Sequence, residues 1–455
     1  MNKKENKISK EKKINKKLAR RNYSNQTGIT LIALVVTIVV LLILAGVSIN
    51  ALFSENGIIK RAQDAQNKMN NAQESDLNAL NDLDKWINNQ VNGTTGGNTT
   101  GGNDNPSTTS KISTLVGKVV DKNTKAEDAY GNKITIPKGF KILEHNPTSS
   151  TGAVTYNYTN SEETGEHIPA VQDGIVIEDT QTGTAGNQFV WVPVGTIKNK
   201  NGSTNTITLG RYEFDSSTGA LKSTTPAQVA SVENCTKIVT ISKGGTDYQE
   251  LSTFREGNSA TNSTAQNATA RNLEEFISTT LANGGYYIAR FEASGTASKI
   301  ASKYNQTVLG NITQPNAAKV AREMYGEVKE NNELVYASDL VNSYAWDTAI
   351  VFIQTYSGKT DYASHNESIT TKAFTATGKN NDKYCNIWDM SGNAYEWTTE
   401  YSAYSSNSYF DRCVYRGGCY STDSGEAHNY TSYRNNSNTT YSNSYYSLRS
   451  LLYVK

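Results

Sequence analysis

Cysteine, histidine and proline are scarce in this chain of 455 residues. The four histidines lie more than twenty residues apart, so a three-histidine metal site would need residues from distant loops. P-loop, G-x-S-x-G and G-x-G-x-x-G motifs are absent, and with them the usual signatures of nucleotide binding and of a serine nucleophile. The cysteines are too few and too scattered for a disulfide-built domain, which leaves one or two bridges open: Cys235, Cys385, Cys413 and Cys419.

Negative charge is nearly missing from residues 1–28, which carry ten Lys and Arg against two Glu. The rest of the chain carries 34 basic and 41 acidic residues, and this mild acidity argues against a nucleic-acid-binding body. No charge occurs over residues 22–54, where residues 29–53 are mostly apolar. As a helix this run would be about 37 Å long, enough to span a membrane with some tilt. A cleaved signal peptide fits poorly because its apolar region is shorter and precedes its small-residue cleavage site.

The basic leader ends at Gly28 and is followed directly by Ile29-Thr30-Leu31-Ile32. This order resembles the prepilin leader of type IV pilins and pseudopilins. The resemblance implies that a prepilin peptidase cuts between Gly28 and Ile29, that the new N-terminus is methylated, and that the apolar helix packs with other pilin subunits. The fifth mature position, usually Glu in that family, is Ala33, so assembly into a filament stays open. A plain signal anchor is the alternative.

A weak apolar stripe continues beyond the membrane segment, with Ile58, Ala62, Ala65 and Met69 at helical spacing. We therefore expect one transmembrane and stalk helix over residues 29–91, the alternative being an amphipathic spacer that lies on its own globular domain. Residues 92–110 contain TTGGN twice and no aliphatic residue. Such a segment buries too little to offset the entropy of ordering, which predicts a flexible linker.

Short alternating strands dominate from residue 111 onward, and they are expected at 114–120, 133–136, 175–178, 188–194, 207–214 and 286–292. Two helices are expected, over 271–281 and 343–354. Because strands and helices do not alternate regularly, this pattern favours an α+β or mostly β head over a parallel sheet.

Five segments of the second half stand in a recognisable order: 187–194, 285–292, 342–349, 387–397 and 415–420. The most specific are D-x-x-G-N-x-x-E-W and R-G-G. This succession is similar to the formylglycine-generating-enzyme family, whose fold is related to C-type lectins. The resemblance covers residues 187–455 and implies a lectin-like domain there, and we interpret residues 111–186 as an added β-rich subdomain.

The family's catalysis is not expected here. Its catalytic members carry two copper-binding cysteines just after the R-G-G strand, whereas residues 421–427 of this chain contain no thiol. Thiolates are the soft ligands that copper requires. Cys413 and Cys419 would lie about 20 Å apart on an extended strand, too far to share a metal unless a bulge or turn shortens the distance.

Calcium binding is the one feature of that family whose residues are present in this sequence. Asp389 and Glu396 flank a Gly-Asn turn, and the matching family segment binds calcium through these two side chains and the carbonyls at the Gly392 and Ala394 positions. Oxygen ligands at a tight turn suit calcium. The alternative is a structural turn whose acids pair with Arg416 or a similar arginine.

Residues 420–447 consist mainly of Tyr, Ser, Thr and Asn, the mixture that antibody-like binding surfaces favour. The stretch is similar in place to the variable region of lectin-fold proteins diversified by retroelements, and an ordinary solvated loop face is the alternative. The expected ligand contacts are Tyr430, Tyr433, Asn435, Asn436, Tyr441, Asn443, Tyr445 and Tyr446.

Together these features predict a membrane-anchored, pilin-like bacterial surface protein with an extracellular, non-catalytic head that binds a protein or glycan. No cofactor is expected apart from Ca²⁺. A structural minor pilin or pseudopilin is the second hypothesis, and a thiol- or metal-dependent oxidase is a distant third.

Overall fold

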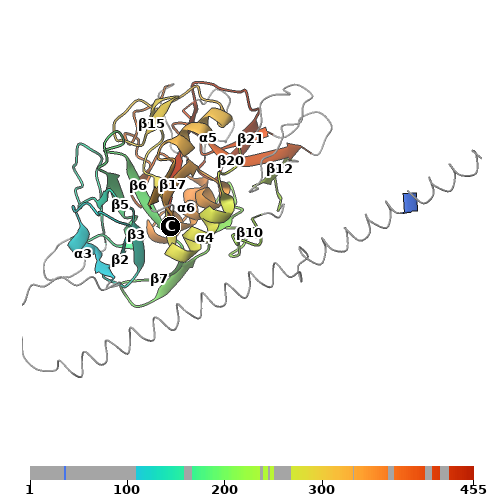
Figure 1. Cartoon of the computed structure of the whole chain (residues 1–455). Helices are drawn as coiled ribbons and strands as arrows, with labels where there is room; N and C mark the ends of the chain where they lie inside the picture. The colour runs from blue at the N-terminus through green and yellow to red at the C-terminus, as the bar shows by residue number, and fades with distance from the viewer. Residues whose placement is uncertain are drawn as a thin grey trace, which may run out of the picture. The chain divides into compact units, whose positions relative to one another are not determined.

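The structure is a computed structural model that describes residues 35–36, 109–157, 167–235, 239–243, 246–250, 268–330, 333–366, 373–404, 412–420 and 430–455. The expected leader cleavage at Gly28 and Ile29, the stalk helix and the linker therefore lie outside the described residues, apart from the helical pair Val35 and Val36 and the last two linker residues, Thr109 and Ser110. Within the described part, no helix has both the length and the apolar character needed to cross a membrane. All elements below belong to one unit, Asn105–Lys455 (Figure 1).

A seven-stranded antiparallel sheet, called here the main sheet, forms the centre of the unit. Its strands, in spatial order, are β16 (Glu327–Glu330), β17 (Glu333–Leu340), β24 (Ser450–Val454), β13 (Gly285–Ala289), β6 (Gln188–Pro193), β5 (Val176–Asp179) and β4 (Phe140–Ile142). The residues of β6, β13 and β24 are all buried, so both faces of the sheet are covered there. Because β4 and β5 are hydrogen-bonded into this sheet, the expected subdomain 111–186 shares it with the domain that follows.

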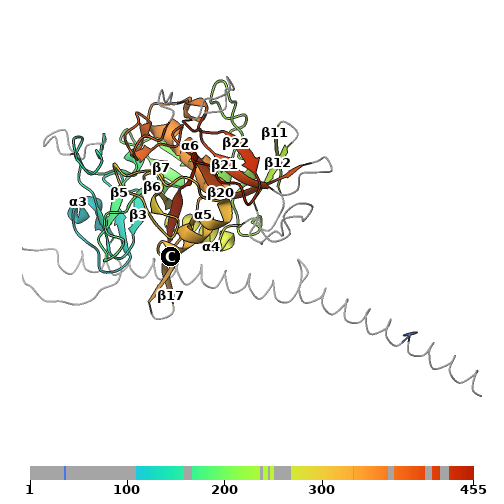
Figure 2. The same cartoon turned by 90° about the horizontal axis from the view of Figure 1, so that it is seen from above.

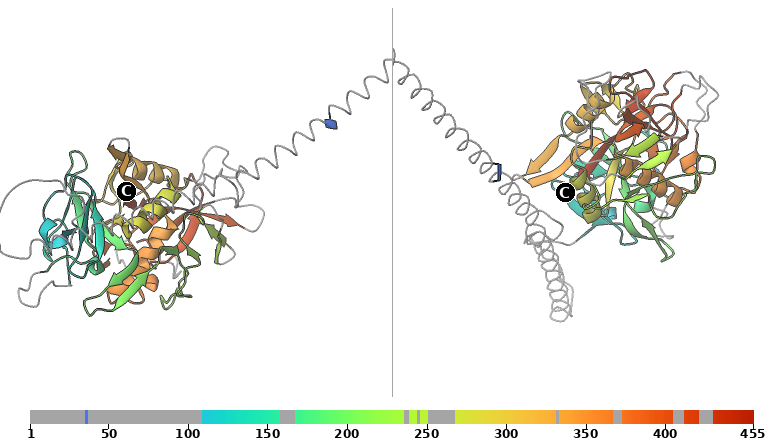
Figure 3. Two further views of the ribbon diagram at one scale, coloured as in Figure 1. Left: turned by 60° about the horizontal axis from the view of Figure 1, so that its bottom comes forward. Right: turned by 90° about the vertical axis from the view of Figure 1, so that its right-hand side faces the viewer.

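A second sheet, called here the tract sheet, carries the polar C-terminal stretch. It contains β11 (Ile241–Lys243), β12 (Thr246–Gln249), β20 (Tyr395–Tyr404), β21 (Arg412–Arg416), β22 (Arg434–Ser437) and, parallel to β20, β23 (Tyr446–Leu448). Figure 2 shows β11, β12, β20, β21 and β22 together on one side of the unit, and Figure 3 shows the same grouping from two further directions.

Three longer helices pack against these sheets: α4 (Leu273–Asn283), α5 (Gln314–Glu323) and α6 (Ser343–Tyr356). The side chains of Asn272 and Asn342 cap α4 and α6 by accepting hydrogen bonds from backbone N–H groups in the first turn. Helix α6 is buried along its first eleven residues, so it is a core helix rather than an amphipathic surface helix.

Shorter elements fill the edges of the unit. A small sheet contains β1 (Ser110–Lys111), β2 (Thr124–Glu127) and β3 (Lys133–Ile136), and four two-stranded pairs are formed by β7 (Gly195–Lys198) with β8 (Thr204–Ile207), β9 (Gly210–Arg211) with β10 (Gln228–Val229), β14 (Ser294–Thr296) with β15 (Lys299–Ala301), and β18 (Lys383–Tyr384) with β19 (Ile387–Trp388). The short helices are α3 (Ile112–Leu115), η1 (Val171–Asp173) and η2 (Tyr362–Ser364).

The described chain is β-rich with few helices, as expected from the sequence. Both expected helices are present, as α4 and α6. The strand expected at 114–120 was wrong, because α3 overlaps its start and Val116 and Val119 make only isolated bridges. The strand expected at 207–214 is broken, because the chain leaves β8 at Ile207 and pairs with a different partner, β10, from Gly210.

Candidate functional site

The predicted ligand-contact residues divide into buried and half-buried groups. Tyr430, Tyr433 and Tyr446 are only 8, 6 and 4% exposed, which corrects the expectation that all five tyrosines stand on the surface. Tyr441 and Tyr445 are half-buried, and so are the three asparagines of the prediction, Asn435, Asn436 and Asn443. The rings of Tyr433 and Tyr446 are buried because they pack on aromatic side chains of β20 and β21, and the ring of Tyr430 packs on Tyr433.

This packing forms a layer of rings beneath the half-buried tyrosines. Tyr446 stacks on Trp397 with the ring centroids 4.7 Å apart, and it meets Tyr415 edge to face at 4.9 Å. Tyr433 lies 6.3 Å from Tyr415. Offset and edge-to-face ring pairs of this kind add stability beyond the area that they bury. The buried tyrosines therefore support the surface rather than form it.

Above this layer lies a group of half-buried rings that we call the tyrosine platform: Phe374, Tyr395, Tyr420, Tyr441 and Tyr445. Ring contacts connect its members, with centroids 5.0 Å apart for Phe374 and Tyr420, 6.4 Å for Tyr420 and Tyr445, and 5.9 Å for Tyr395 and Tyr445. The hydroxyl oxygens of Tyr441 and Tyr445 are 3.4 Å apart. Phe374 and Tyr395 were missed at the sequence level because they come from segments distant from the stretch 420–447. Tyr420 lies in that stretch but was not among the expected contacts.

The backbone under the platform is fixed by hydrogen bonds from other segments. Asn311 N donates to Asn443 O at 2.9 Å, and Tyr395 N donates to Tyr445 O at 2.9 Å. Gly310 lies so close that a Cβ there would be 2.3 Å from the Ser444 carbonyl oxygen. The chain around Asn443 and Tyr445 is thus held in one conformation, which lowers the entropic cost of binding a ligand.

The platform is uncharged. No charged residue occurs between Asn435 and Leu448. The hydrogen bond with the Tyr441 hydroxyl and burial raise the pKa of Tyr445 to about 12, so its hydroxyl stays neutral at physiological pH. A surface of neutral rings, hydroxyls and amides suits a neutral ligand with apolar faces and hydroxyl or amide groups.

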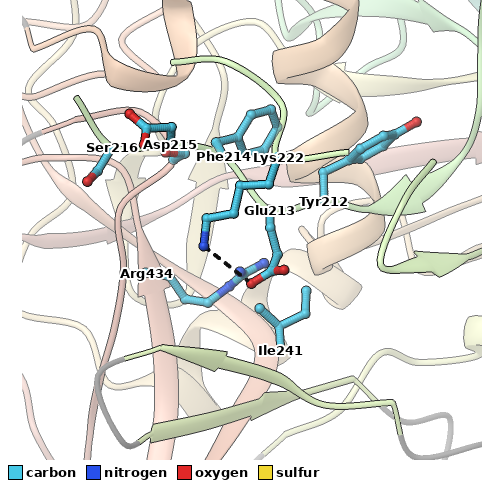
Figure 4. Close-up of a pocket in the computed structure, with 9 residues that line it drawn as sticks. Tyr212, Glu213, Phe214, Asp215, Ser216, Lys222, Ile241 and Arg434 are labelled. Atoms are coloured by element: carbon cyan, nitrogen blue, oxygen red, sulfur yellow. Dashed lines mark ion pairs between the residues drawn. The ribbon is translucent and has the colours of Figure 1, made fainter. Parts of the chain in front are cut away.

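A cavity of about 230 Å³ lies where the tract sheet meets the loop after β9 (Figure 4). Tyr212, Phe214 and Ile241 contribute apolar wall, and Lys222 pairs with Glu213 at 3.8 Å. Arg434, the first residue of β22, also lines the cavity. Glu213 and Lys222 offset each other's charge, and the Asp215 carboxylate adds a further negative charge to the lining.

Arg434 belongs to a buried group of charges that we call the buried ion cluster: Arg211, Asp347, Glu400, Arg416 and Arg434. Glu400 accepts from Arg211 at 2.6 Å and from Arg434 at 2.9 Å, and Asp347 accepts from Arg434 at 2.9 Å and from Arg416. Burial alone would raise the pKa of Glu400, but Arg434, Arg211 and Arg416 together lower it to about 2. The guanidinium of Arg434 is therefore committed to the fold.

A further buried carboxylate, that of Glu250, contacts the start of α6. It accepts hydrogen bonds from the backbone N–H and hydroxyl of Ser343 at 2.9 and 2.8 Å and from the Thr399 hydroxyl at 2.6 Å. Burial raises the pKa of Glu250 to about 7 despite these bonds. The ionised form is thus less favourable in the folded protein than in the unfolded chain.

The raised pKa of Glu250 predicts a pH-dependent stability. Its contribution is fully present below the unfolded pKa of about 4.5 and is lost as the pH rises through about 7, a change of about 3 kcal/mol. In Glu250→Gln this loss disappears, so the variant should gain stability relative to the wild type between pH 4.5 and 8. Thermal unfolding of both proteins across this range measures the difference, and parallel curves would contradict the prediction.

The residues expected to bind calcium are engaged with protein groups instead. Both Glu396 carboxylate oxygens accept from Arg449, at distances of 2.6 to 3.1 Å. The Arg449 guanidinium also donates to the Asp389 carbonyl at 3.1 Å, and the Asp389 carboxylate accepts from Gly378 N and the Asn380 amide. Gly392 and Asn393 form the expected turn with positive φ, and the Ala394 N–H donates to Glu292.

This arrangement is the structural alternative, with Arg449 rather than Arg416 as the cation. No group of three or more His, Cys, Asp or Glu residues in the described part is arranged to hold a metal ion. Calcium coordination by Glu396 would require Arg449 to leave. The residues present therefore do not fit a calcium site as they are placed here.

All four cysteines are free thiols. Burial raises the pKa of Cys235, Cys385 and Cys413, and Cys413 and Cys419 are almost completely enclosed. A buried thiol with a raised pKa is a poor nucleophile and a poor metal ligand, because both roles need the thiolate. The geometry gives the oxidase hypothesis no reactive thiol pair.

No family model matches this sequence, and the search of curated proteins found no match. Among solved structures, CarF is similar at 14% identity and a TM-score of 0.27, covering 38% of this chain and 87% of that chain. PvdO from Pseudomonas aeruginosa is similar at 10% identity and a TM-score of 0.23, covering 38% and 82%. The P3c variant of Major Tropism Determinant is similar at 12% identity and a TM-score of 0.26, covering 76% and 98%. The function is therefore argued from this chain's own residues.

Proposed function

We propose that the described part of this chain is a non-catalytic binding module whose tyrosine platform contacts an extracellular protein or glycan. The observation that carries the proposal is the two-layer arrangement of rings. Half-buried Tyr395, Tyr441 and Tyr445 rest on Trp397 and Tyr446, which are buried. Such rings offer a large contact area at low conformational cost, as at other Tyr-rich binding surfaces.

The chemistry of the platform favours an uncharged ligand surface. Its rings can pack against the C–H faces of a sugar or against apolar side chains. The Tyr420 and Tyr441 hydroxyls and the Asn435, Asn436 and Asn443 amides all belong to the polar stretch 420–447, and they supply hydrogen-bond donors and acceptors. Neutral groups of this kind bind without the desolvation cost of an ion pair.

The buried charges are better explained as part of the fold that presents a binding surface than as catalytic groups. Glu400 and Asp347 are saturated by three arginines, and Glu396 is saturated by Arg449. A general acid or base must reach the substrate, and these groups are enclosed and paired. They stabilise the fold that presents the platform.

The leader ending at Gly28 and the apolar run of residues 29–53 support display of this module from a membrane. In the proposal, prepilin peptidase processes the leader, the apolar helix anchors the chain or joins other pilin subunits, and the polar linker 92–110 separates anchor from head. The second candidate, a structural minor pilin, is favoured only by the same leader motif, and Ala33 in place of the usual Glu weakens it.

The test compares full-length protein with the double variant Tyr441→Ser/Tyr445→Ser on arrays of glycans and of bacterial and host surface proteins. We expect the variant to lose binding by tenfold or more, since a hot-spot ring contributes about 2 kcal/mol, while its unfolding temperature changes little. Tyr130→Ser, at an equally half-buried tyrosine on the β2–β3 turn, is the matched control and should bind normally.

Two other results would decide against the platform. Equal binding by the wild type and the double variant would place the contact surface elsewhere in the head. An absence of any ligand for the wild type would favour the structural pilin. Tyr446→Ser distinguishes a residue that supports the platform from one that contacts the ligand. Loss of this buried ring should lower the unfolding temperature as well as binding.

A further inference from the structure

Two histidines, His145 and His167, stack on each other with their ring centroids 4.0 Å apart and their planes inclined by 14°. They lie on either side of Tyr156 in the sequence. His145 is half-buried and His167 is exposed. Neither residue belongs to the tyrosine platform or to the buried ion cluster, so the binding function proposed above does not explain why these rings are paired.

The two imidazoles are the hydrogen-bond partners of the Tyr156 backbone. Tyr156 N donates to His145 Nδ1 at 3.0 Å, and His167 Nδ1 donates to Tyr156 O at 2.7 Å. Tyr156 is completely buried, so water does not replace either partner. Because a buried backbone N–H or C=O without a hydrogen bond is costly, the chain around Tyr156 depends on both rings.

The Tyr156 side chain attaches this part of the chain to the main sheet. Its hydroxyl donates to the Leu143 carbonyl at 3.0 Å and accepts from Val176 N, at the start of β5, at 3.3 Å. The neighbouring residues Thr155 and Asn157 line a cavity of about 200 Å³ beside the turn between β18 and β19. The histidine pair therefore helps to hold both a core tyrosine and one wall of a cavity.

The two hydrogen bonds respond differently to a proton. His145 Nδ1 accepts and carries no hydrogen, whereas His167 Nδ1 donates and carries one. When His167 is protonated at Nε2, its bond to the Tyr156 carbonyl stays intact. When His145 is protonated, the new hydrogen is on Nδ1 and faces the Tyr156 N–H. Only His145 therefore loses its hydrogen bond when it becomes charged.

The charges around His145 also oppose its protonation. His167 stacks on the ring, and Lys383 of β18 adds a positive charge nearby. Burial, and then His167 and Lys383, hold the pKa of His145 below its usual range. The acidic groups of this region, Glu144 and Asp173, do not offset that effect. A proton on His145 is thus unfavourable in the folded protein for both reasons, the lost hydrogen bond and the neighbouring charge.

We propose that His145 and His167 form a pH-sensitive clasp, which holds residues 154–157 on the main sheet at neutral pH and releases them in acid. We call these residues the clasped segment. The trigger is one proton on His145 Nδ1, which leaves the buried Tyr156 N–H without an acceptor and places a charge against the second ring. Release of the clasped segment also alters the wall of the cavity beside the β18–β19 turn. The clasp is independent of the tyrosine platform.

Hydrogen–deuterium exchange of the full-length protein at pH 7.5, 6.0 and 5.0, corrected for the pH dependence of the intrinsic exchange rate, measures the clasp directly. We expect the protection of the clasped segment to fall by about tenfold or more between pH 7.5 and 5.0, since the Tyr156 N–H loses its acceptor. Peptides from β3 and β13 should keep their protection. The double variant Tyr441→Ser/Tyr445→Ser should respond to pH as the wild type does.

His145→Asn identifies the ring that titrates, because the asparagine oxygen can accept from the Tyr156 N–H but is not protonated in this range. Since the pKa of His145 is depressed by folding, its stabilisation is present above the unfolded value of about 6.5 and is lost as the pH falls through the folded value. The unfolding temperature of the variant should therefore rise relative to the wild type below pH 6.5. His167→Asn keeps a donor for the Tyr156 carbonyl and, as the matched control, should still release the segment in acid.

The comparison of the wild type with His145→Asn cancels the contribution of every other titrating group, and Glu250 acts with the opposite sign. Three results would overturn the proposal: unchanged protection of the clasped segment at pH 5.0, an equal loss of protection in β3 and β13, or the same acid response in His145→Asn as in the wild type. The exchange measurement on the wild type decides the first two without any variant.

Discussion

Replacing Glu400 with glutamine is expected to lower the free energy of unfolding of the head by about 3–5 kcal/mol. Glu400 is completely buried and bonds Arg211 and Arg434, with Arg416 at 3.4 Å. Without its charge, three enclosed guanidinium groups would be balanced by Asp347 alone. Chemical denaturation of wild type and variant at pH 7 measures the loss.

The pH dependence gives an independent check on Glu400. Its folded pKa of about 2 lies below the unfolded value of about 4.5, so its stabilisation is present above pH 4.5 and is lost as the pH falls through 2. Glu400→Gln should remove this acid-sensitive component. Glu213→Gln is the matched control, because Glu213 pairs with Lys222 at the surface and should change stability by no more than about 0.5 kcal/mol. Equal effects of the two substitutions would contradict the role assigned to the cluster.

The sequence offered an arginine partner for Asp389 and Glu396 as one alternative, but it could not identify which charges are buried together. Charged residues are rarely enclosed, so Arg416, Arg434 and Arg449 would ordinarily be assigned to the surface. Their partners come from other segments: Arg434 meets Asp347 on α6, and Arg449 meets Glu396 on β20. Only the three-dimensional pairing of these strands and helices brings the charges within ion-pair distance.

Local patterns did predict part of the fold. The strand expected at 133–136 is β3, and the strand expected at 188–194 corresponds closely to β6. Helices α4 and α6 each begin directly after an N-capping asparagine. Helix α5 was not expected because it begins at a Gln-Pro pair within a polar stretch and buries mainly small side chains, Ala317, Ala318 and Ala321. Small residues give a weak hydrophobic period even when they face the core.

The sequence proposed a ligand-contact surface in the polar stretch 420–447, but it could not say which side chains of that stretch reach the surface. The frequency of Tyr, Ser, Thr and Asn singled out the stretch 420–447, yet alternation along the chain cannot separate Tyr445, which is half-buried, from Tyr446, which stacks on Trp397. The distinction arises from β23, which pairs with β20 and turns Tyr446 toward the core. The same pairing brings Tyr395 beside Tyr445, which is why the platform includes residues outside the C-terminal stretch.

Arg449→Met is the second substitution expected to have a large effect, also about 3–5 kcal/mol at pH 7. It would leave Glu396 and the nearby Glu292 buried without a cation and would remove the donors to the carbonyls of Ala289, Trp388 and Asp389. Burial already raises the pKa of Glu292 and Glu396, and Arg449 opposes that shift. Since protonation neutralises both acids, the loss should be smaller at pH 4 than at pH 7.

Denaturation at the two pH values, with Lys319→Met as a control at an exposed ion pair, tests whether Arg449 is the cation of this site. Arg449→Lys should recover part of the stability, because lysine keeps the charge but cannot form the bidentate contact. In the wild type, EDTA and Ca²⁺ should leave the unfolding midpoint unchanged, since the guanidinium already neutralises Glu396. A midpoint that rises with Ca²⁺ would show that the ion displaces Arg449 and would restore the calcium interpretation of Asp389 and Glu396.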